Sequence, residues 1–183
     1  MSTQLVLMGP SGAGKTSLML GSAGIWRGHN FTVDRTWTTQ TPRSGEGTAE
    51  KIFTNRDDFT RRRACFLMTF STFADYEYGI DAQSQLERNE VRMRILPPAV
   101  ALRFRHIVQD RVTLCSITPY TLDVESLILA RDPAISVDDL AQRVERIERD
   151  QEDAAKIANI CFQNTPGLEE ATARFRNTVT DYF

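Results

Sequence analysis

The stretch Gly9-Pro10-Ser11-Gly12-Ala13-Gly14-Lys15-Thr16 constrains the fold of this chain more than any other part of its sequence. The apolar run 5–8 precedes it and the helix-compatible run 17–20 follows it, which predicts a buried strand, a loop and a helix. Glycines let such a loop turn its backbone N–H groups toward phosphate oxygens, and the positive end of the helix adds to the attraction. We therefore expect residues 9 to 16, with Ser17, to bind the phosphates of a nucleotide. Lys15 would reach the outer phosphates, and the Thr16 hydroxyl would be a ligand of Mg²⁺.

Length and composition set the broad class of the protein. The 183 residues fit a single domain, residues 1–183, and the net charge of −2 provides no basic field of the kind that gathers nucleic acid. Neither a secretory signal nor a membrane-spanning run is recognised, so we expect a cytoplasmic protein with no nucleic-acid or membrane partner. The cysteines, which are odd in number, are expected to be reduced, buried thiols: Cys65, Cys115 and Cys161.

Hydrophobic patterning predicts alternating strands and helices along the rest of the chain. Expected strands cover 31–33, 51–54, 65–70, 91–95, 112–117 and 157–162, and expected helices cover 55–63, 99–107, 122–130, 136 onward and 168–182. Asn55 is a predicted N-cap, and Ser136 with Asp139 forms a predicted capping box. The alternation in 91–95 predicts a strand with one exposed face, on which Arg92 and Arg94 lie; a contact of either arginine with an anion is the alternative.

The loop Thr38-Thr39-Gln40-Thr41-Pro42-Arg43-Ser44-Gly45-Glu46 resembles the acceptor-binding segment of guanylate kinases. Arg35 and the aromatic residue near it are also similar to a related family, the ribose 1,5-bisphosphate phosphokinases. In the guanylate kinase pattern two arginines of this segment grip the acceptor phosphate. Arg43 falls on one of these positions, and Gln40 takes the place of the other. The resemblance therefore implies an acceptor site that includes Thr38, Gln40 and Arg43.

The resemblance continues at Tyr78-Gly79, and it implies that Tyr78 donates to the acceptor phosphate. Lys51 stands where guanylate kinases have a further phosphate-binding tyrosine. Thr69 and Ile80 occupy the positions of a glutamate and a hydroxyl residue that read guanine, and the strand 91–95 lacks the family's aspartates. A site without those donors and acceptors cannot select guanine by hydrogen bonds.

The C-terminal third resembles the lid and adenine side of the same family. Arg131 and Arg143 fall on two lid arginines that contact the transferring phosphate, with the lid at 131–142. An ordinary charged helix is the alternative interpretation of Arg143. Asn164 follows the last expected strand, in a turn that the family places near the adenine, so the resemblance implies a contact with the base.

Together these observations predict an α/β fold: a parallel sheet with helices on both faces, a P-loop kinase arrangement with an acceptor-binding lobe at 31–79. The implied activity is transfer of the γ-phosphate of ATP, with Mg²⁺, to a small phosphorylated molecule, with Lys15, Arg131 and Arg143 as catalytic residues. A sugar phosphate of the ribose 1,5-bisphosphate type or a nucleoside monophosphate is the expected acceptor. GMP itself is one alternative, and a guanylate kinase-like binding module without catalysis is another. A regulatory GTPase is disfavoured because no Asn-Lys-x-Asp segment is found. The sequence does not indicate an oligomeric state.

Overall fold

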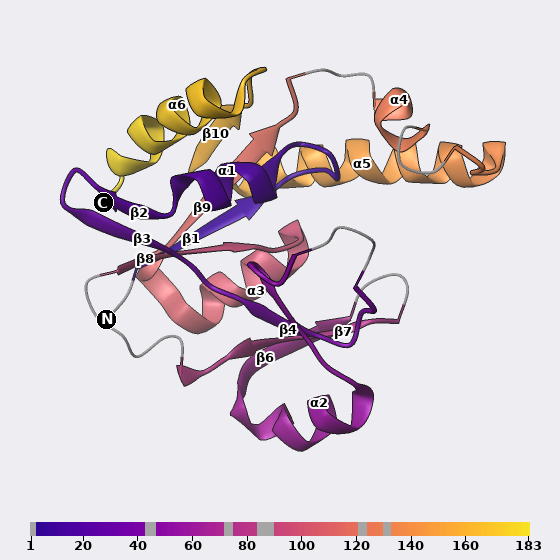
Figure 1. Cartoon of the computed structure of the whole chain (residues 1–183), viewed down its shortest axis with the longest axis horizontal. Helices are drawn as coiled ribbons and strands as arrows, with labels where there is room; N and C mark the ends of the chain where they lie inside the picture. Colours follow the sequence, from indigo (N-terminus) through magenta and orange to yellow (C-terminus); the bar gives the residue numbers. More distant parts are fainter. Residues whose placement is uncertain (1–2, 43–46, 72–74, 84–89, 121–123, 130–132) are drawn as a thin grey trace.

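A six-stranded sheet forms the centre of the computed structural model, which describes residues 3–42, 47–71, 75–83, 90–120, 124–129 and 133–183 (Figure 1). The strand order is β10-β9-β1-β8-β3-β2, and all neighbours are parallel except the antiparallel pair β2 and β3. The strands are β1 (Thr3–Met8), β2 (Gly24–Trp26), β3 (His29–Val33), β8 (Glu90–Ile95), β9 (Val112–Thr118) and β10 (Ile160–Gln163). This arrangement confirms the predicted parallel sheet and adds an edge strand, β2, that the sequence pattern did not indicate.

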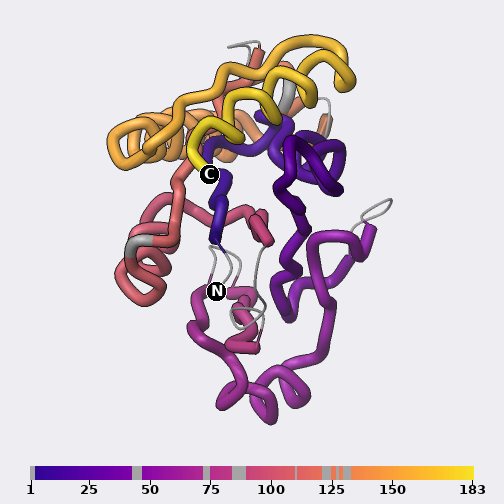
Figure 2. The backbone as a smooth tube through the Cα atoms, turned by 90° about the vertical axis from the view of Figure 1, so that its left-hand side faces the viewer, coloured from indigo at the N-terminus to yellow at the C-terminus, as the bar shows by residue number. Residues whose placement is uncertain are grey.

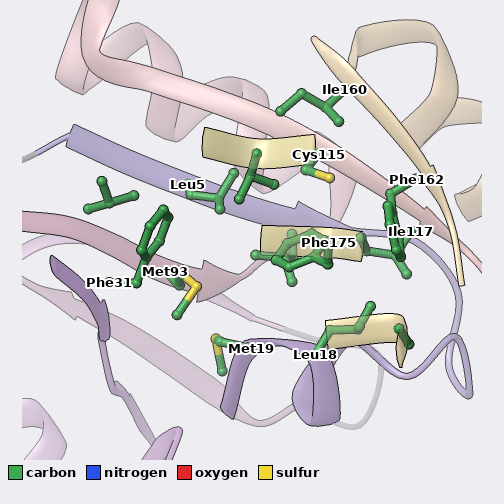
Figure 3. Packing of buried hydrophobic residues seen from close by; sticks show 14 of the residues in the cluster. Leu5, Leu18, Met19, Phe31, Met93, Cys115, Ile117, Ile160, Phe162 and Phe175 are labelled. Atoms are coloured by element: carbon green, nitrogen blue, oxygen red, sulfur yellow. The ribbon is translucent and has the colours of Figure 1, made fainter. Parts of the chain in front are cut away.

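Helices pack on both faces of this sheet, as predicted. On one face α1 (Lys15–Ser22) contacts α6 (Leu168–Thr180), and their apolar side chains close a core with β1, β8, β9 and β10. Figure 3 shows this core, in which Leu18 and Phe175 lie over the sheet and are almost fully buried. On the other face lie α3 (Pro98–Val108) and α5 (Val137–Ile157), and the short α4 (Val124–Leu129) packs against α5. The central strand β1 is consequently buried from both sides, which explains its uninterrupted apolar run.

A second sheet of four strands forms the separate part seen at the lower end of Figures 1 and 2. Its order is β5-β4-β7-β6, with β4 (Thr36–Thr38), β5 (Lys51–Phe53), β6 (Phe66–Ser71) and β7 (Glu77–Asp81). Beside it lies α2 (Arg56–Arg62), which is capped as predicted because the Asn55 side chain accepts a hydrogen bond from the Asp58 N–H at 2.8 Å. One-turn 3₁₀ helices cover Arg63–Cys65 and Gln109–Arg111.

Two expectations about exposure are wrong. Arg92 and Arg94 do not lie on an open strand face, because β8 is an interior strand and the side chains of both arginines are 10% exposed or less. Cys65 and Cys161 are exposed thiols, and only Cys115 is buried. Period-two patterning identifies which residues share a face, but it does not say whether that face is later covered.

The predicted lid, residues 131–142, is described only in part. Residues 131 and 132 lie outside the described part of the chain, whereas 137–142 are the first turns of α5. That helix begins at the predicted cap, since Ser136 Oγ accepts a hydrogen bond from the Asp139 N–H at 3.1 Å. Within the described residues, no helix combines the length and apolarity that crossing a membrane requires.

Candidate active site

The loop between β1 and α1 has the backbone that its glycines predict. Gly9 has φ +126°, and a Cβ there would lie 2.3 Å from the Ile117 carbonyl oxygen. Gly14, the N-cap of α1, has φ +81°, and its Cβ would lie 2.4 Å from Asn164 Nδ2. A residue with a side chain would be strained and crowded at both positions. The loop thus keeps its shape only with glycine where it crosses β9 and the turn after β10.

Lys15 folds back over this loop from the first position of α1. Its Nζ donates hydrogen bonds to the carbonyl oxygens of Gly9 at 2.8 Å and Pro10 at 2.6 Å. The ammonium group is therefore held at the mouth of the loop, beside the backbone that is expected to surround phosphates.

A cavity of about 550 Å³ opens next to the loop. From the loop and α1 it is lined by Ser11, Gly12, Gly14, Lys15, Thr16, Ser17 and Met19. Its other wall comes from the small sheet and the ends of β3 and β8, and includes Thr36, Lys51, Phe70 and Tyr78. The two segments that the sequence assigned to nucleotide and acceptor, although distant along the chain, thus border one space.

Three of the predicted acceptor residues form a hydrogen-bonded cluster on the small sheet. The side-chain oxygen of Gln40 accepts from the Tyr78 hydroxyl at 2.9 Å and from Lys51 Nζ at 3.2 Å. The Tyr78 ring stacks on Phe70, with centroids 5.1 Å apart. Thr38 is fully buried, and its hydroxyl accepts a hydrogen bond from the Gln40 backbone N–H at 3.0 Å, which helps to hold Gln40 in place. The result is an ammonium and a phenol fixed side by side on the cavity wall.

Thr69 and Arg143 are the remaining predicted acceptor and lid residues that the structure describes, and neither lies on this wall. Thr69 lies between Met68 and the cavity residue Phe70 in β6, so its side chain points to the opposite face of the small sheet. Arg143 is exposed on α5 and is absent from the described cavity lining. Arg43 and Arg131 lie outside the described residues. Their roles stay predictions.

Asn164 braces the loop between β1 and α1, which is the predicted phosphate-binding loop. Its amide nitrogen donates to the Ala13 carbonyl oxygen at 3.0 Å, and its side-chain oxygen accepts from the Thr165 N–H at 2.9 Å. Its backbone N–H donates to the Thr118 carbonyl oxygen at 2.9 Å, which ties the turn after β10 to the end of β9. Asn164 therefore contacts the predicted nucleotide loop directly, and the predicted contact with the base stays a prediction.

An acidic side chain of α5 also lies near the loop. Burial raises the pKa of the Asp150 carboxyl above its ordinary value, and the charges of Lys15 and Arg146 offset part of that effect.

Thr16 and Glu50 form the part of the cavity that suits a magnesium ion. Thr16 Oγ1 donates to Glu50 Oε2 at 2.8 Å, and both residues line the cavity. Mg²⁺ prefers oxygen ligands and is commonly held by one or two protein oxygens together with water and substrate phosphates. Within the described residues, no group of three or more His, Cys, Asp or Glu side chains could hold a metal by itself. This donor set fits an ion that arrives with a nucleotide.

A group of buried charged side chains, Asp34, Arg92 and Arg94, includes one residue of the cavity lining, Asp34. Asp34 follows β3 and accepts a hydrogen bond from Arg94, and Arg92 Nη1 lies 3.7 Å from the same carboxylate oxygen, Oδ2. Burial lowers the pKa of the Arg94 guanidinium, the charge of Asp34 opposes that shift, and Arg92 adds to it. Sequence reasoning missed Asp34, Glu50 and Phe70. The position of Asp34 at the carboxyl end of a parallel strand was the available signal.

The chain has a guanylate kinase-like P-loop kinase fold, with the loop of residues 9–16 at the carboxyl end of β1. Among solved structures, the chain is similar to the guanylate kinase from Anaplasma phagocytophilum, with a TM-score of 0.70 and 16% sequence identity. The match covers 99% of this chain and 86% of that one. No protein-family model matches the sequence, and no curated protein matches it either. The likeness is thus one of fold.

Proposed function

We propose that this chain is a nucleotide-kinase-like phosphotransferase that moves the γ-phosphate of ATP, with Mg²⁺, to a small molecule that already carries a phosphate. One observation carries the proposal: a single cavity is lined by Lys15 and Thr16 on one wall and by Lys51 and Tyr78 on the other. An ammonium and a phenol are hydrogen-bond donors that suit phosphate oxygens. The likeness to a guanylate kinase supports the same reaction class.

The reaction requires little acid–base catalysis from the protein. An oxygen of the acceptor phosphate attacks the γ-phosphorus of ATP, the bond from that phosphorus to the bridging oxygen breaks, and ADP leaves with the electron pair. The acceptor oxygen is already anionic, so no general base is required. The residues position the two phosphates and stabilise negative charge, which is the main source of catalysis in phosphoryl transfer. Lys15 serves the outer phosphates, and Mg²⁺ bound near Thr16 and Glu50 would neutralise part of their charge.

A sugar phosphate of the ribose 1,5-bisphosphate type is the acceptor we favour, with a nucleoside monophosphate as the second candidate. At the two described positions where guanylate kinases read guanine, the cavity has no such group: Thr69 points away from it, and Ile80 is fully buried in the core that the small sheet shares with β1, α3 and β9. Phe70 adds an apolar surface with no hydrogen-bonding group. The loop Thr41-Pro42-Arg43 and the likeness to a guanylate kinase favour GMP, which therefore belongs in the test.

The test follows ADP release from Mg-ATP in the presence of ribose 1,5-bisphosphate, GMP and the other nucleoside monophosphates. Transfer to at least one acceptor, abolished in Lys15→Ala, is the expected result. ATP binding without ADP release for any acceptor would instead indicate the binding module that shares this fold. Release that survives in Lys15→Ala would show that the nucleotide does not bind at the loop.

A further inference from the structure

Asp34 is a carboxylate in a cavity whose other polar side chains suit phosphates. It lies at the carboxyl end of β3, is 8% exposed, and lines the same cavity as Lys15 and Tyr78. A carboxylate repels a phosphate, so neither phosphate of the proposed reaction accounts for it. Any contact of Asp34 with the acceptor therefore involves a group other than a phosphate.

The carboxylate is held in one orientation by residues of β8 and β1. Arg94, whose side chain is fully buried, donates from Nη2 to Asp34 Oδ2 and to Gln4 Oε1, the latter at 3.0 Å. Its guanidinium also lies over the Phe104 ring, 4.5 Å from the centroid. Arg92 approaches the same oxygen, Oδ2. The described residues offer no donor to the second oxygen, Oδ1, which leaves Oδ1 as the acceptor that Asp34 presents to a ligand.

The charges around Asp34 disfavour a cation as that ligand. Arg92 contacts both Asp34 and Glu90, at 3.7 and 3.3 Å, so two arginines face two carboxylates. Both carboxylates are thus already paired with arginines, and a metal ion or an amine would have to compete with those positive charges. A neutral hydrogen-bond donor remains as the partner of Oδ1, and Thr36 is a second polar residue that lines the same cavity.

We propose that Asp34 recognises a hydroxyl group of the acceptor, with Arg94 as its positioning residue, so that the site selects a phosphorylated sugar by its hydroxyls. This inference rests on the proposed function, because it places the acceptor between the phosphate loop and the cluster of Gln40, Lys51 and Tyr78. A hydrogen bond to a charged group accounts for about 10- to 100-fold in affinity. The loss of one hydroxyl from the acceptor is therefore measurable.

The experiment compares two series of acceptors on the full chain. One series is ribose 1,5-bisphosphate with its 2-deoxy and 3-deoxy analogues, and the other is GMP with its 2′-deoxy and 3′-deoxy analogues. Binding is measured by calorimetry and transfer by ADP release. In the wild type, we expect one deoxy analogue in at least one series to lose about 10- to 100-fold in affinity. In Asp34→Asn, the affinities for the hydroxylated and the deoxy acceptor are expected to differ by about 3-fold or less, mainly because the hydroxylated acceptor binds more weakly.

Two further variants separate recognition from folding. Glu90→Gln alters the same charge cluster through Arg92 but leaves the cavity wall unchanged, so it keeps the wild-type ratio. If Asp34→Asn fails to fold because Arg94 is left buried without its carboxylate, the double variant Asp34→Asn/Arg94→Met removes both charges. Replacing a buried pair with groups of similar volume is often tolerated. The double variant is expected to fold and to bind hydroxylated and deoxy acceptors equally.

The outcomes separate this inference from the proposed function. Discrimination between hydroxylated and deoxy acceptors in binding, without ADP release, supports Asp34 as the recognition residue while the transferase assignment fails. Equal binding of all members of both series by the wild type, or no binding at all, overturns the inference. Discrimination that persists in Asp34→Asn also overturns it.

Discussion

Thr16 donates a hydrogen bond to Glu50 at 2.8 Å, although the two residues are 34 positions apart in the sequence. The contact joins the first turn of the helix behind the phosphate loop to the residue that precedes β5. The two walls of the cavity thus meet at a hydroxyl and a carboxylate, the oxygen donors that Mg²⁺ prefers.

Glu50→Gln is expected to raise the Mg²⁺ concentration needed for half-maximal activity by about 10-fold, the lower end of effects on metal affinity from groups around a site. The amide keeps the size of the side chain and loses its charge. Activity against Mg²⁺ at fixed ATP, with Mn²⁺ binding to the ADP complex by electron paramagnetic resonance, measures the change. Glu152→Gln, on the exposed surface of α5, is the control. An unchanged Mg²⁺ requirement in Glu50→Gln would contradict this role.

Lys15→Ala is expected to lower kcat by about 10²- to 10³-fold, the usual effect of removing one group that stabilises developing charge. Among the contacts described above, Nζ donates to the Gly9 and Pro10 carbonyl oxygens of its own loop, and its charge acts on Asp150, so thermal unfolding of the variant is measured beside its activity. ADP release with the best acceptor measures the loss. Lys156→Ala removes a lysine whose side chain is 65% exposed and paired only with α5 carboxylates among those contacts, and it should be neutral.

Tyr78→Phe is expected to raise the KM for the acceptor by about 10-fold and to leave the KM for ATP unchanged. The variant loses the hydroxyl that would turn from Gln40 to donate to the acceptor phosphate, together with its hydrogen bond to Gln40. The ring keeps its stack on Phe70. Tyr182→Phe is the matched control, since that hydroxyl contacts only the Asn159 carbonyl oxygen, at 3.4 Å, among the contacts described. Equal effects on both substrates would mean that Tyr78 acts on the shape of the cavity.

Asn164→Ala is expected to weaken ATP and GTP binding by the same factor, because the side chain braces the phosphate loop through Ala13. A direct contact with adenine predicts a different result, a loss for ATP alone. Titration of both nucleotides against wild type and variant distinguishes these two roles.

The buried thiol gives a prediction about pH. Burial raises the pKa of Cys115 to about 12, and the nearby Cys161 adds to the shift. The unfolded chain releases this proton near the ordinary pKa of 9.0, so the thiol's contribution to stability is complete below pH 9 and declines between about pH 9 and 12. Urea unfolding at pH 8 and pH 10 measures the decline, and Cys115→Ala should show less of it. Iodoacetamide at pH 8 should modify the exposed Cys65 and Cys161 and leave Cys115 unmodified until unfolding.

Local sequence chemistry was sufficient for much of the fold. The glycines of the phosphate loop, the Asn55 cap and the Ser136 cap each depend on neighbours within a few positions, and all three are confirmed. The buried run of β1 identified an interior strand, because a parallel strand covered on both faces has no polar alternation.

Burial and contacts that depend on residues far apart in the sequence could not be predicted from local patterns. Arg94 looked like a surface residue because its partners, Asp34 and Gln4, are 60 and 90 positions away. Thr69 lies in a strand that the sequence predicted, yet the face that it occupies depends on how β6 pairs with β7, where a register shift occurs between Phe66 and Met68. Glu50 carried no local signal for its contact with Thr16.

The cluster of Gln40, Lys51 and Tyr78 is joined by hydrogen bonds and carried by or next to strands of a single sheet. The three side chains therefore keep their relative positions if the small sheet shifts, because one sheet carries them all. The span between donor and acceptor phosphates is accordingly set by how the small sheet packs on the core of the central one. Substitutions within the trio will change how firmly an acceptor is held, while the length of acceptor that fits will depend on the packing between the two sheets.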